Sequence, residues 1–382
     1  MRLILMDAAR LRIAFVLPFA APRPRGALKV VYRIAEWLTF WRHTVVVLHP
    51  EHSLLSRTGP VSEDGVLAVS SSQNTAYDGS HPHPWHRSRV QLDSRVVPCL
   101  AEEHIGGPYD AIVATAWQVV PIVEGYSPAC GRKLYYLQDY ESYLLGTPAE
   151  RGAIGRTLAV PWPLVVSSQA IAQFVRSVID RQITIIPCAV DVEAFQVTVP
   201  IDSEHRCLIG FPARREQAKC TGDAIEALTV LRSGFGRRLQ PWCFGYDEMP
   251  MLPNWIYHVH APDDDQLRHL YNLTRIFIVP SMYEGFGLPG AEAMACGAAL
   301  VSTRNGGVDS YAIDDETALL CDPREPPHLA ATIERLLADD HLRRRIACRA
   351  AATVNRRTWE HAAREFEHVL FRAVQAQPRE PR

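Results

Sequence analysis

The order of apolar segments constrains this chain more than any other feature of its sequence. Residues 11–19, LRIAFVLPF, and residues 43–50, HTVVVLHP, are short apolar runs rich in residues that favour β-strands. Between them, residues 26–41, GALKVVYRIAEWLTFW, carry apolar side chains at helical spacing. Strands that are apolar on both faces and joined by a helix fit a parallel sheet that helices cover. The pattern therefore predicts an α/β protein.

The alternation forms two series, and polar residues 196–206 separate them. The first series continues with strands within residues 109–116, 133–141, 163–179 and 183–191, with one helix behind the third of these. The second series comprises strands at 207–211, 241–246, 256–260, 275–280 and 298–303, with helices at 222–233 and 263–273, after Pro289 and from His328 on. Residues 51–95 show no clear period and are predicted as loops and an irregular insert.

A chain of 382 residues exceeds what one hydrophobic core usually serves, so two Rossmann-like domains are expected. We place the first at residues 1–195 and the second at 205–355, with a further helix and tail at 356–382. In open α/β sheets ligands bind at the carboxyl ends of the strands, which in a two-domain protein can face a central cleft.

Composition excludes several classes of protein. The formal net charge of −2 predicts no nucleic-acid partner, and the nine scattered cysteines contain no C-x-x-C pair. We therefore expect free thiols in a reducing compartment and no structural metal site. No window reaches the roughly 18 uninterrupted apolar residues of a membrane span. The expectation is a cytoplasmic protein whose membrane contact, if any, is peripheral at the inner face.

The segment SMYEGFGLPGAEAMACGAAL, residues 281–300, carries the strongest chemical signal. Pro289 predicts a helix start, so the backbone amides of Gly285, Phe286, Gly287 and Leu288 would lie at a helix N-terminus, where anions bind. Glu292 would lie in the first turn of this helix, and Glu284 in the loop before it.

A phosphate site flanked by two carboxylates fits a nucleotide-sugar, because such a molecule has hydroxyl groups on both sides of its diphosphate. One carboxylate would bind the ribose and the other the sugar. The alternative is that Glu292 is only a favourable charge near a helix start and Glu284 a surface residue. That alternative is favoured for either glutamate alone, but not for the pair with its glycines.

The segment PSMYEGFGLPGAEAMACGAALVSTRNGGVDSYAIDDETALLCDP resembles the E-x7-E signature of GT4-type retaining glycosyltransferases of the GT-B fold. The similarity extends from about residue 183 to 340, including IPCAVDVEAF and GFPARREQAKCTGDAIEAL. It implies that a C-terminal helix, here within residues 357–374, crosses back to the first domain. It also implies transfer of a sugar, with retention, from a nucleoside diphosphate donor to a hydroxyl of a glycan, a lipid-linked glycan or a small molecule.

The resemblance also implies roles for individual residues. Arg214 and Lys219 would bind the donor's diphosphate, Glu284 the transferred sugar and Glu292 the ribose. Cations and helix-end amides can stabilise a departing diphosphate, so no metal or other cofactor is expected. The alternative for Arg214 and Lys219 is a solvated loop that carries scattered charge.

Three positions depart from the family pattern. Cys220 stands where the family usually has glycine after the lysine, and Ala189 stands where it has glycine in a Pro-Asn-Gly-Val-Asp run. The glycine-rich N-terminal loop of the family is reduced to Gly26, which could still let the backbone approach the diphosphate, with Arg23, Arg25 or Lys29 supplying charge. Solvated charges at a helix start are an equal alternative.

The segment YYLQDYESY, residues 135–143, is similar to one in rhamnosyltransferase-like members. Gln138, Asp139 and Glu141 follow a predicted strand and could face the sugar or the acceptor. An equal alternative is that they cap the next helix. The hypothesis of a deoxysugar donor such as rhamnose depends on this segment.

Two other functions compete with glycosyl transfer. A sugar-nucleotide epimerase or hydrolase could share the architecture, and the Cys220 and Ala189 replacements could mark a non-catalytic nucleotide-sugar-binding homologue. An NAD enzyme is disfavoured, because no G-x-G-x-x-G follows the first strand.

Overall fold

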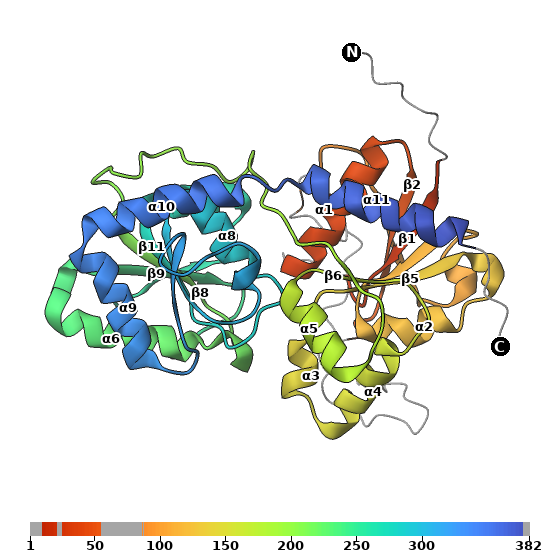
Figure 1. Cartoon of the computed structure of the whole chain (residues 1–382), viewed down its shortest axis with the longest axis horizontal. Coiled ribbons are helices and arrows are strands. Elements are labelled where there is room, and N and C mark those ends of the chain that lie inside the picture. The colour runs from red at the N-terminus through yellow and green to blue at the C-terminus, as the bar shows by residue number, and fades with distance from the viewer. Residues whose placement is uncertain (1–9, 21–24, 55–85, 87, 377–382) are drawn as a thin grey trace, which may run out of the picture.

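The computed structural model describes residues 10–20, 25–54, 86 and 88–376. Within these ranges the chain forms two α/β domains, each built on one parallel sheet between helices (Figure 1). This confirms the predicted pair of Rossmann-like domains. Most of the predicted insert at 51–95 lies outside the described residues. None of the helices in the described part of the chain is long and apolar enough to cross a membrane.

The first domain has a seven-stranded sheet in the order β3-β2-β1-β4-β5-β6-β7. Its strands are β1 (Arg12–Val16), β2 (Thr44–Pro50), β3 (Asp93–Val97), β4 (Ala111–Ala114), β5 (Arg132–Leu137), β6 (Leu164–Val166) and β7 (Thr184–Ile185). Its helices are α1 (Gly26–Phe40), α2 (Val120–Glu124), α3 (Glu141–Leu145), α4 (Pro148–Leu158) and α5 (Gln169–Val178). Alternate side chains of β1 enter two separate cores, one under α1 and the other under α2 and α5.

The second domain has a six-stranded sheet in the order β10-β9-β8-β11-β12-β13. Its strands are β8 (Leu208–Pro212), β9 (Gln240–Gly245), β10 (Tyr257–His260), β11 (Thr274–Val279), β12 (Ala299–Thr303) and β13 (Ala318–Cys321). Its helices are α6 (Thr221–Phe235), α7 (Asp264–Leu273), α8 (Leu288–Ala295), α9 (Pro326–Ala338) and α10 (Asp340–Val354). Helices α6 and α9 pack on one face of the sheet, and α7 and α8 pack on the other.

The C-terminal helix α11 (Trp359–Gln375) leaves the second domain and packs on the first, beside α1 (Figure 1). Its Phe366 ring lies 5.8 Å from that of Phe15 and 5.2 Å from that of Tyr136. Glu367 contacts the buried His43 imidazole at 2.9 Å. The crossing predicted for the last helix is therefore confirmed, and it is held by aromatic packing on the first sheet.

The sequence predicts one helix within residues 109–191, whereas the structure adds α2, α3 and α4 there. Helix α4 escapes prediction because its apolar residues form only a weak stripe, and because Gly152 and Gly155 lower its helix propensity. A signal for it was present, however. Thr147 and Glu150 form a capping box at its start, in which each side chain bonds the other's backbone N–H.

The polar segment 196–206 has no strand or helix, yet it is fixed to the second domain. The guanidinium of Arg206, which is 3% exposed, donates to the carbonyls of Val199, Thr274 and Cys296. The Asn272 side chain accepts from the amides of Thr198 and Val199 at 2.7 and 3.1 Å. These bonds satisfy backbone groups that a strand would otherwise pair.

Candidate active site

The N-terminus of α8 lies at the boundary between the two domains. The helix begins at Leu288, one residue before the predicted start at Pro289, and its N-cap Gly287 has φ of +90°, which glycine adopts at little cost. No side chain caps this end, so its first amides remain available to a ligand. A Cβ atom added to Gly285 would lie 2.2 Å from the carbonyl oxygen of Gln138, so the loop before α8 touches the first domain.

The N-terminus of α1 faces the same place from the first domain. Gly26 is the first residue of α1, and a Cβ atom there would lie 3.6 Å from the side chain of Leu288. No side chain caps α1 either, so the positive ends of two helix dipoles converge. Arg23 lies outside the described residues, and the Arg25 guanidinium stacks over the Phe19 ring.

Lys219 is shared by one carboxylate from each domain. Its ammonium lies 2.7 Å from Glu141 at the start of α3 and 3.0 Å from Glu284 in the loop before α8. The amide of Met282 donates to the carbonyl of Ala218, which holds the two loops of the second domain together. Ser281 donates to the second oxygen of Glu284 at 2.7 Å. The structure thus brings Lys219, Glu284 and Glu141 into one cluster.

Burial and charge shift the pKa values of this cluster. Burial lowers the pKa of Lys219, but the carboxylates of Glu284 and Glu141 outweigh it and raise the pKa above its ordinary value. Burial also raises the pKa of Glu141 to about 8, and the attraction of Lys219 offsets only part of that rise. Burial therefore favours the protonated form of Glu141 more than that of an exposed carboxyl group.

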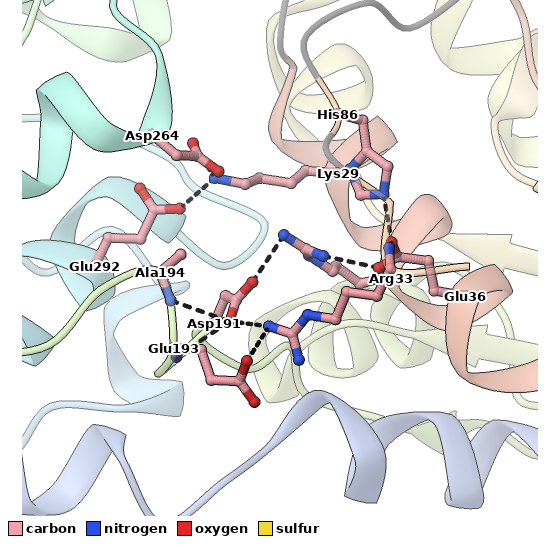
Figure 2. Close-up of polar contacts among 10 residues, drawn as sticks. Lys29, Arg33, Glu36, His86, Asp191, Glu193, Ala194, Asp264 and Glu292 are labelled. Atoms are coloured by element: carbon pink, nitrogen blue, oxygen red, sulfur yellow. Dashed lines mark hydrogen bonds and ion pairs between the residues drawn. The ribbon is translucent and has the colours of Figure 1, made fainter. Parts of the chain in front are cut away.

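Lys29 of α1 forms the second link between the domains. Its ammonium lies 3.0 Å from Glu292 of α8 and 2.9 Å from Asp264 at the start of α7, and Figure 2 shows it between the two carboxylates. Burial raises the pKa of Glu292, which is 5% exposed, and Lys29 offsets part of that rise. The prediction that Glu292 lies in the first turn is wrong. Because α8 begins at Leu288, Glu292 lies in its second turn, where it is aimed at α1 rather than at the amides.

A network that sequence reasoning missed lies beside this link (Figure 2). Arg33 of α1 contacts Asp191 at 2.7 Å and Glu36 at 2.8 Å, and Arg89 contacts Asp191 at 3.0 Å. Glu36 also contacts the buried His86 at 3.2 Å. Asp191 belongs to the IPCAVD segment quoted above, which was the available signal. Its partners are far away in sequence, so no local pattern pointed to them.

Arg214 is placed differently from Lys219. Its guanidinium donates to the carbonyls of Ala213 and Phe244 at 3.0 and 3.1 Å and lies over the rings of Phe244 and Tyr246. Among the described residues no carboxylate forms an ion pair with it. The structure therefore keeps Arg214 near the carboxyl end of β8 but does not join it to the Lys219 cluster.

Gln138, Asp139 and Glu141 have three separate environments. Asp139, one residue before the N-cap Tyr140, accepts from the Glu141 amide at 2.7 Å and the Ser142 hydroxyl at 2.6 Å, and so holds the start of α3. Glu141 contacts Lys219 instead. The side-chain amide nitrogen of Gln138 is buried without a hydrogen-bond partner in the described structure, at the carboxyl end of β5.

Cys220, where the resemblance led us to expect glycine, has φ of +46° in the left-handed region. A side chain there costs about 1 kcal/mol relative to glycine. Cys220 therefore adopts a backbone conformation that glycine reaches at lower cost. The buried Ala189 has no positive φ, so its position places no such demand on the backbone.

Residues 251–353 match the family model described as glycosyl transferases group 1. This segment includes Glu284 and Glu292 but not Arg214 or Lys219. The chain is 36% identical over 121 residues to a D-inositol 3-phosphate glycosyltransferase of Xylanimonas cellulosilytica, and the match covers 31% of this chain and 29% of that protein. It is 35% identical over 107 residues to the O-antigen chain mannosyltransferase B of Escherichia coli, covering 28% of each. The match thus spans less than a third of these relatives' length.

Solved structures resemble nearly the whole chain. Anabaena Alr3699/HepE, in a complex with UDP and glucose, superposes with a TM-score of 0.74 at 16% identity, covering 95% of this chain and 100% of that one. A sucrose-phosphate synthase from Thermosynechococcus elongatus superposes with a TM-score of 0.69 at 18% identity, covering 95% of this chain and 98% of that one. The chain therefore has the GT-B fold, and residues 251–353 of its second domain match the group 1 glycosyl transferases.

Proposed function

We propose that this protein is a glycosyltransferase that uses a nucleoside diphosphate sugar as donor. The second domain would hold most of the donor, and the first domain would hold an acceptor hydroxyl of a glycan, a lipid-linked glycan or a small molecule. The names of the matched relatives, a glycosyltransferase and a mannosyltransferase, agree with this activity.

One observation carries the proposal. The uncapped N-terminus of α8 lies directly beside Glu284, because a Cβ atom on Gly287 would be 3.8 Å from the Glu284 side chain, and Glu284 contacts Lys219 at 3.0 Å. Helix-end amides and an ammonium group together favour a diphosphate, and a carboxylate beside them can accept hydrogen bonds from sugar hydroxyls. The N-terminus of α1 adds a second positive end from the other domain.

The roles of the remaining residues follow from this placement. Arg214, for which the described part of the chain supplies no ion-pairing carboxylate, would join Lys219 in binding the diphosphate. Glu292 would bind the ribose, and Lys29 already contacts one of its two carboxylate oxygens. Because Glu292 is 5% exposed and faces Lys29, we propose that the contact between α1 and α8 loosens at Lys29 when the donor enters.

We further propose that transfer retains the configuration of the sugar and needs no metal ion. The acceptor would attack on the side of the leaving diphosphate, whose developing charge Lys219, Arg214 and the helix amides stabilise. The resemblance of YYLQDYESY to rhamnosyltransferase-like proteins supports a deoxysugar among the donors to be tested.

The first test is calorimetry of the purified protein with UDP-glucose, GDP-mannose, ADP-glucose and dTDP-rhamnose, with EDTA present. We expect one donor to bind, and Arg214→Ala to weaken it at least about tenfold, as loss of a charged contact does. Arg215→Ala is the matched control, because Arg215 is exposed and adjacent. Binding of none of these donors would contradict the proposal.

The second test is product analysis with the donor that binds and a panel of glycan and lipid-linked acceptors. A glycoside whose anomeric configuration matches the donor's supports retaining transfer. Free sugar or an epimer without a glycoside would favour the hydrolase or epimerase. Binding without turnover of any acceptor would favour a non-catalytic homologue.

A further inference from the structure

Two carboxylates, one from each domain, contact the single positive charge of Lys219. Glu141 reaches it from the first domain at 2.7 Å and Glu284 from the second at 3.0 Å. The three side chains are 16–20% exposed, so water screens their charges only in part. With both carboxylates ionised the cluster carries one net negative charge.

Other groups around Glu141 do not relieve this excess of negative charge. Asp139 of the same loop and Glu284 both disfavour its ionised form, and the nearby Tyr140 phenol is neutral. Lys219 is the one cation of the described chain that forms an ion pair with Glu141. Glu141 therefore depends on Lys219 for its charge, whereas Glu284 also accepts from Ser281.

A diphosphate that binds Lys219 removes the counter-ion of Glu141 and brings further negative charge next to it. We propose that Glu141 is a positioning residue for Lys219 that competes with the donor's diphosphate, so that donor binding displaces Glu141 and adds a proton from solvent to its carboxylate. This inference rests on the proposed function and assigns Glu141 a part in it other than binding the sugar or the acceptor. The only covalent change is the new O–H bond on Glu141.

The direction of the pH dependence follows from this competition. Where Glu141 is already protonated in the free protein, the donor meets no competitor and takes up no proton. Because burial raises the pKa of Glu141, its protonated form extends to higher pH than that of an exposed carboxyl group. At higher pH the donor must displace an ionised Glu141, so affinity falls by up to about tenfold per pH unit.

The experiment is titration calorimetry with the donor identified above, in buffers of different ionisation enthalpy, between about pH 6.5 and 8.5. Nucleoside diphosphate sugars serve as probes because their phosphates do not titrate in this range. For the wild type we expect proton uptake that grows with pH and an affinity that falls at the alkaline end. Glu141→Gln should take up no proton and bind more tightly than the wild type at the alkaline end.

Glu150→Gln is the matched control, since it changes the same charge one helix further on without touching Lys219. It should retain the wild-type proton uptake. A wild type that binds donor with no proton uptake, or a folded Glu141→Gln variant that binds more weakly at every pH, overturns the inference and leaves the proposed function standing. If no donor binds the wild type, both fail.

Discussion

The ammonium of Lys29 in the first domain lies 3.0 Å from a carboxylate oxygen of Glu292 in the second. The two side chains are 12% and 7% exposed, and 263 residues separate them in the sequence. A buried charge pair of this kind is costly to break from one side, because the remaining charge stays out of water.

We therefore expect Lys29→Met to destabilise the protein by about 3 kcal/mol at neutral pH, and the loss to grow as pH rises and Glu292 ionises. The double variant with Glu292→Gln should recover about 1–3 kcal/mol of this loss. Denaturant unfolding of the wild type, the two single variants and the double variant measures the coupling free energy between Lys29 and Glu292. The exposed pair Arg335–Asp315 is the control, and a cycle there should show almost no coupling. Equal coupling in the two cycles would contradict the prediction.

The second prediction concerns Gly285. Its Cβ atom would meet the Gln138 carbonyl oxygen at 2.2 Å, and that oxygen belongs to the other domain. Gly285→Ala should therefore leave each domain folded but force them apart, and we expect transfer activity to fall at least about tenfold. Small-angle scattering should show a larger radius of gyration. Gly155→Ala is the control, since among the described residues a Cβ atom there meets nothing within 4 Å apart from its chain neighbours and the backbone of its own helix. An unchanged radius and full activity of Gly285→Ala would refute this account.

The third prediction concerns acid stability and the buried His49. Its Nδ1–H donates to the Phe19 carbonyl at 2.9 Å, so its Nε2 accepts from the Tyr32 hydroxyl at 2.6 Å. Burial lowers the pKa of His49 to about 4, from an ordinary value of 6.5. The unfolded chain then binds a proton that the folded chain excludes. The free energy of unfolding should fall by up to about 3 kcal/mol as pH drops from 6.5 to about 4. Above pH 6.5 this contribution should remain constant.

Urea unfolding at a series of pH values measures the effect. In His49→Gln this part of the pH dependence should disappear, even though the variant is less stable overall. His269→Gln changes an exposed histidine and should keep the wild-type slope. The same slope in wild type and His49→Gln would show that other groups cause the acid sensitivity.

The fourth prediction concerns Arg206, a buried cation bonded to carbonyl oxygens. Burial lowers its pKa to about 10, and its bonds go to Val199, Pro200, Thr274, Cys296 and the Asn272 side chain. A lysine ammonium cannot reach all of these acceptors, so Arg206→Lys should cost about 3 kcal/mol. Hydrogen exchange at residues 196–206 should rise, and donor binding should not change. Arg344→Lys changes an exposed arginine and should leave both stability and exchange unchanged. If residues 196–206 of Arg206→Lys exchange their amide hydrogens as slowly as those of the wild type, the prediction is wrong.

The alternation of strands and helices was predictable because burial acts locally along the chain. A strand such as β11, apolar on both faces, can lie only inside a covered sheet, and a run such as α1 shows its buried face through spacing alone. The same holds for the glycines and the proline around α8, since backbone conformation depends on the residue itself. Helix α4 was not predicted because its apolar stripe is weak, although the capping box at its start was a local signal for it.

The amino-acid sequence therefore established the two-domain α/β architecture and the loop that carries Glu284. The partners of the charged residues depended on the packing of the domains. Lys219 meets Glu141 and Lys29 meets Asp264 across 78 and 235 residues of chain. No local pattern reports such pairs, because they arise only when two separately folded sheets place their loops against each other. Glu292 shows the difference: its place in α8 follows from the sequence, but its burial against α1 follows from that contact.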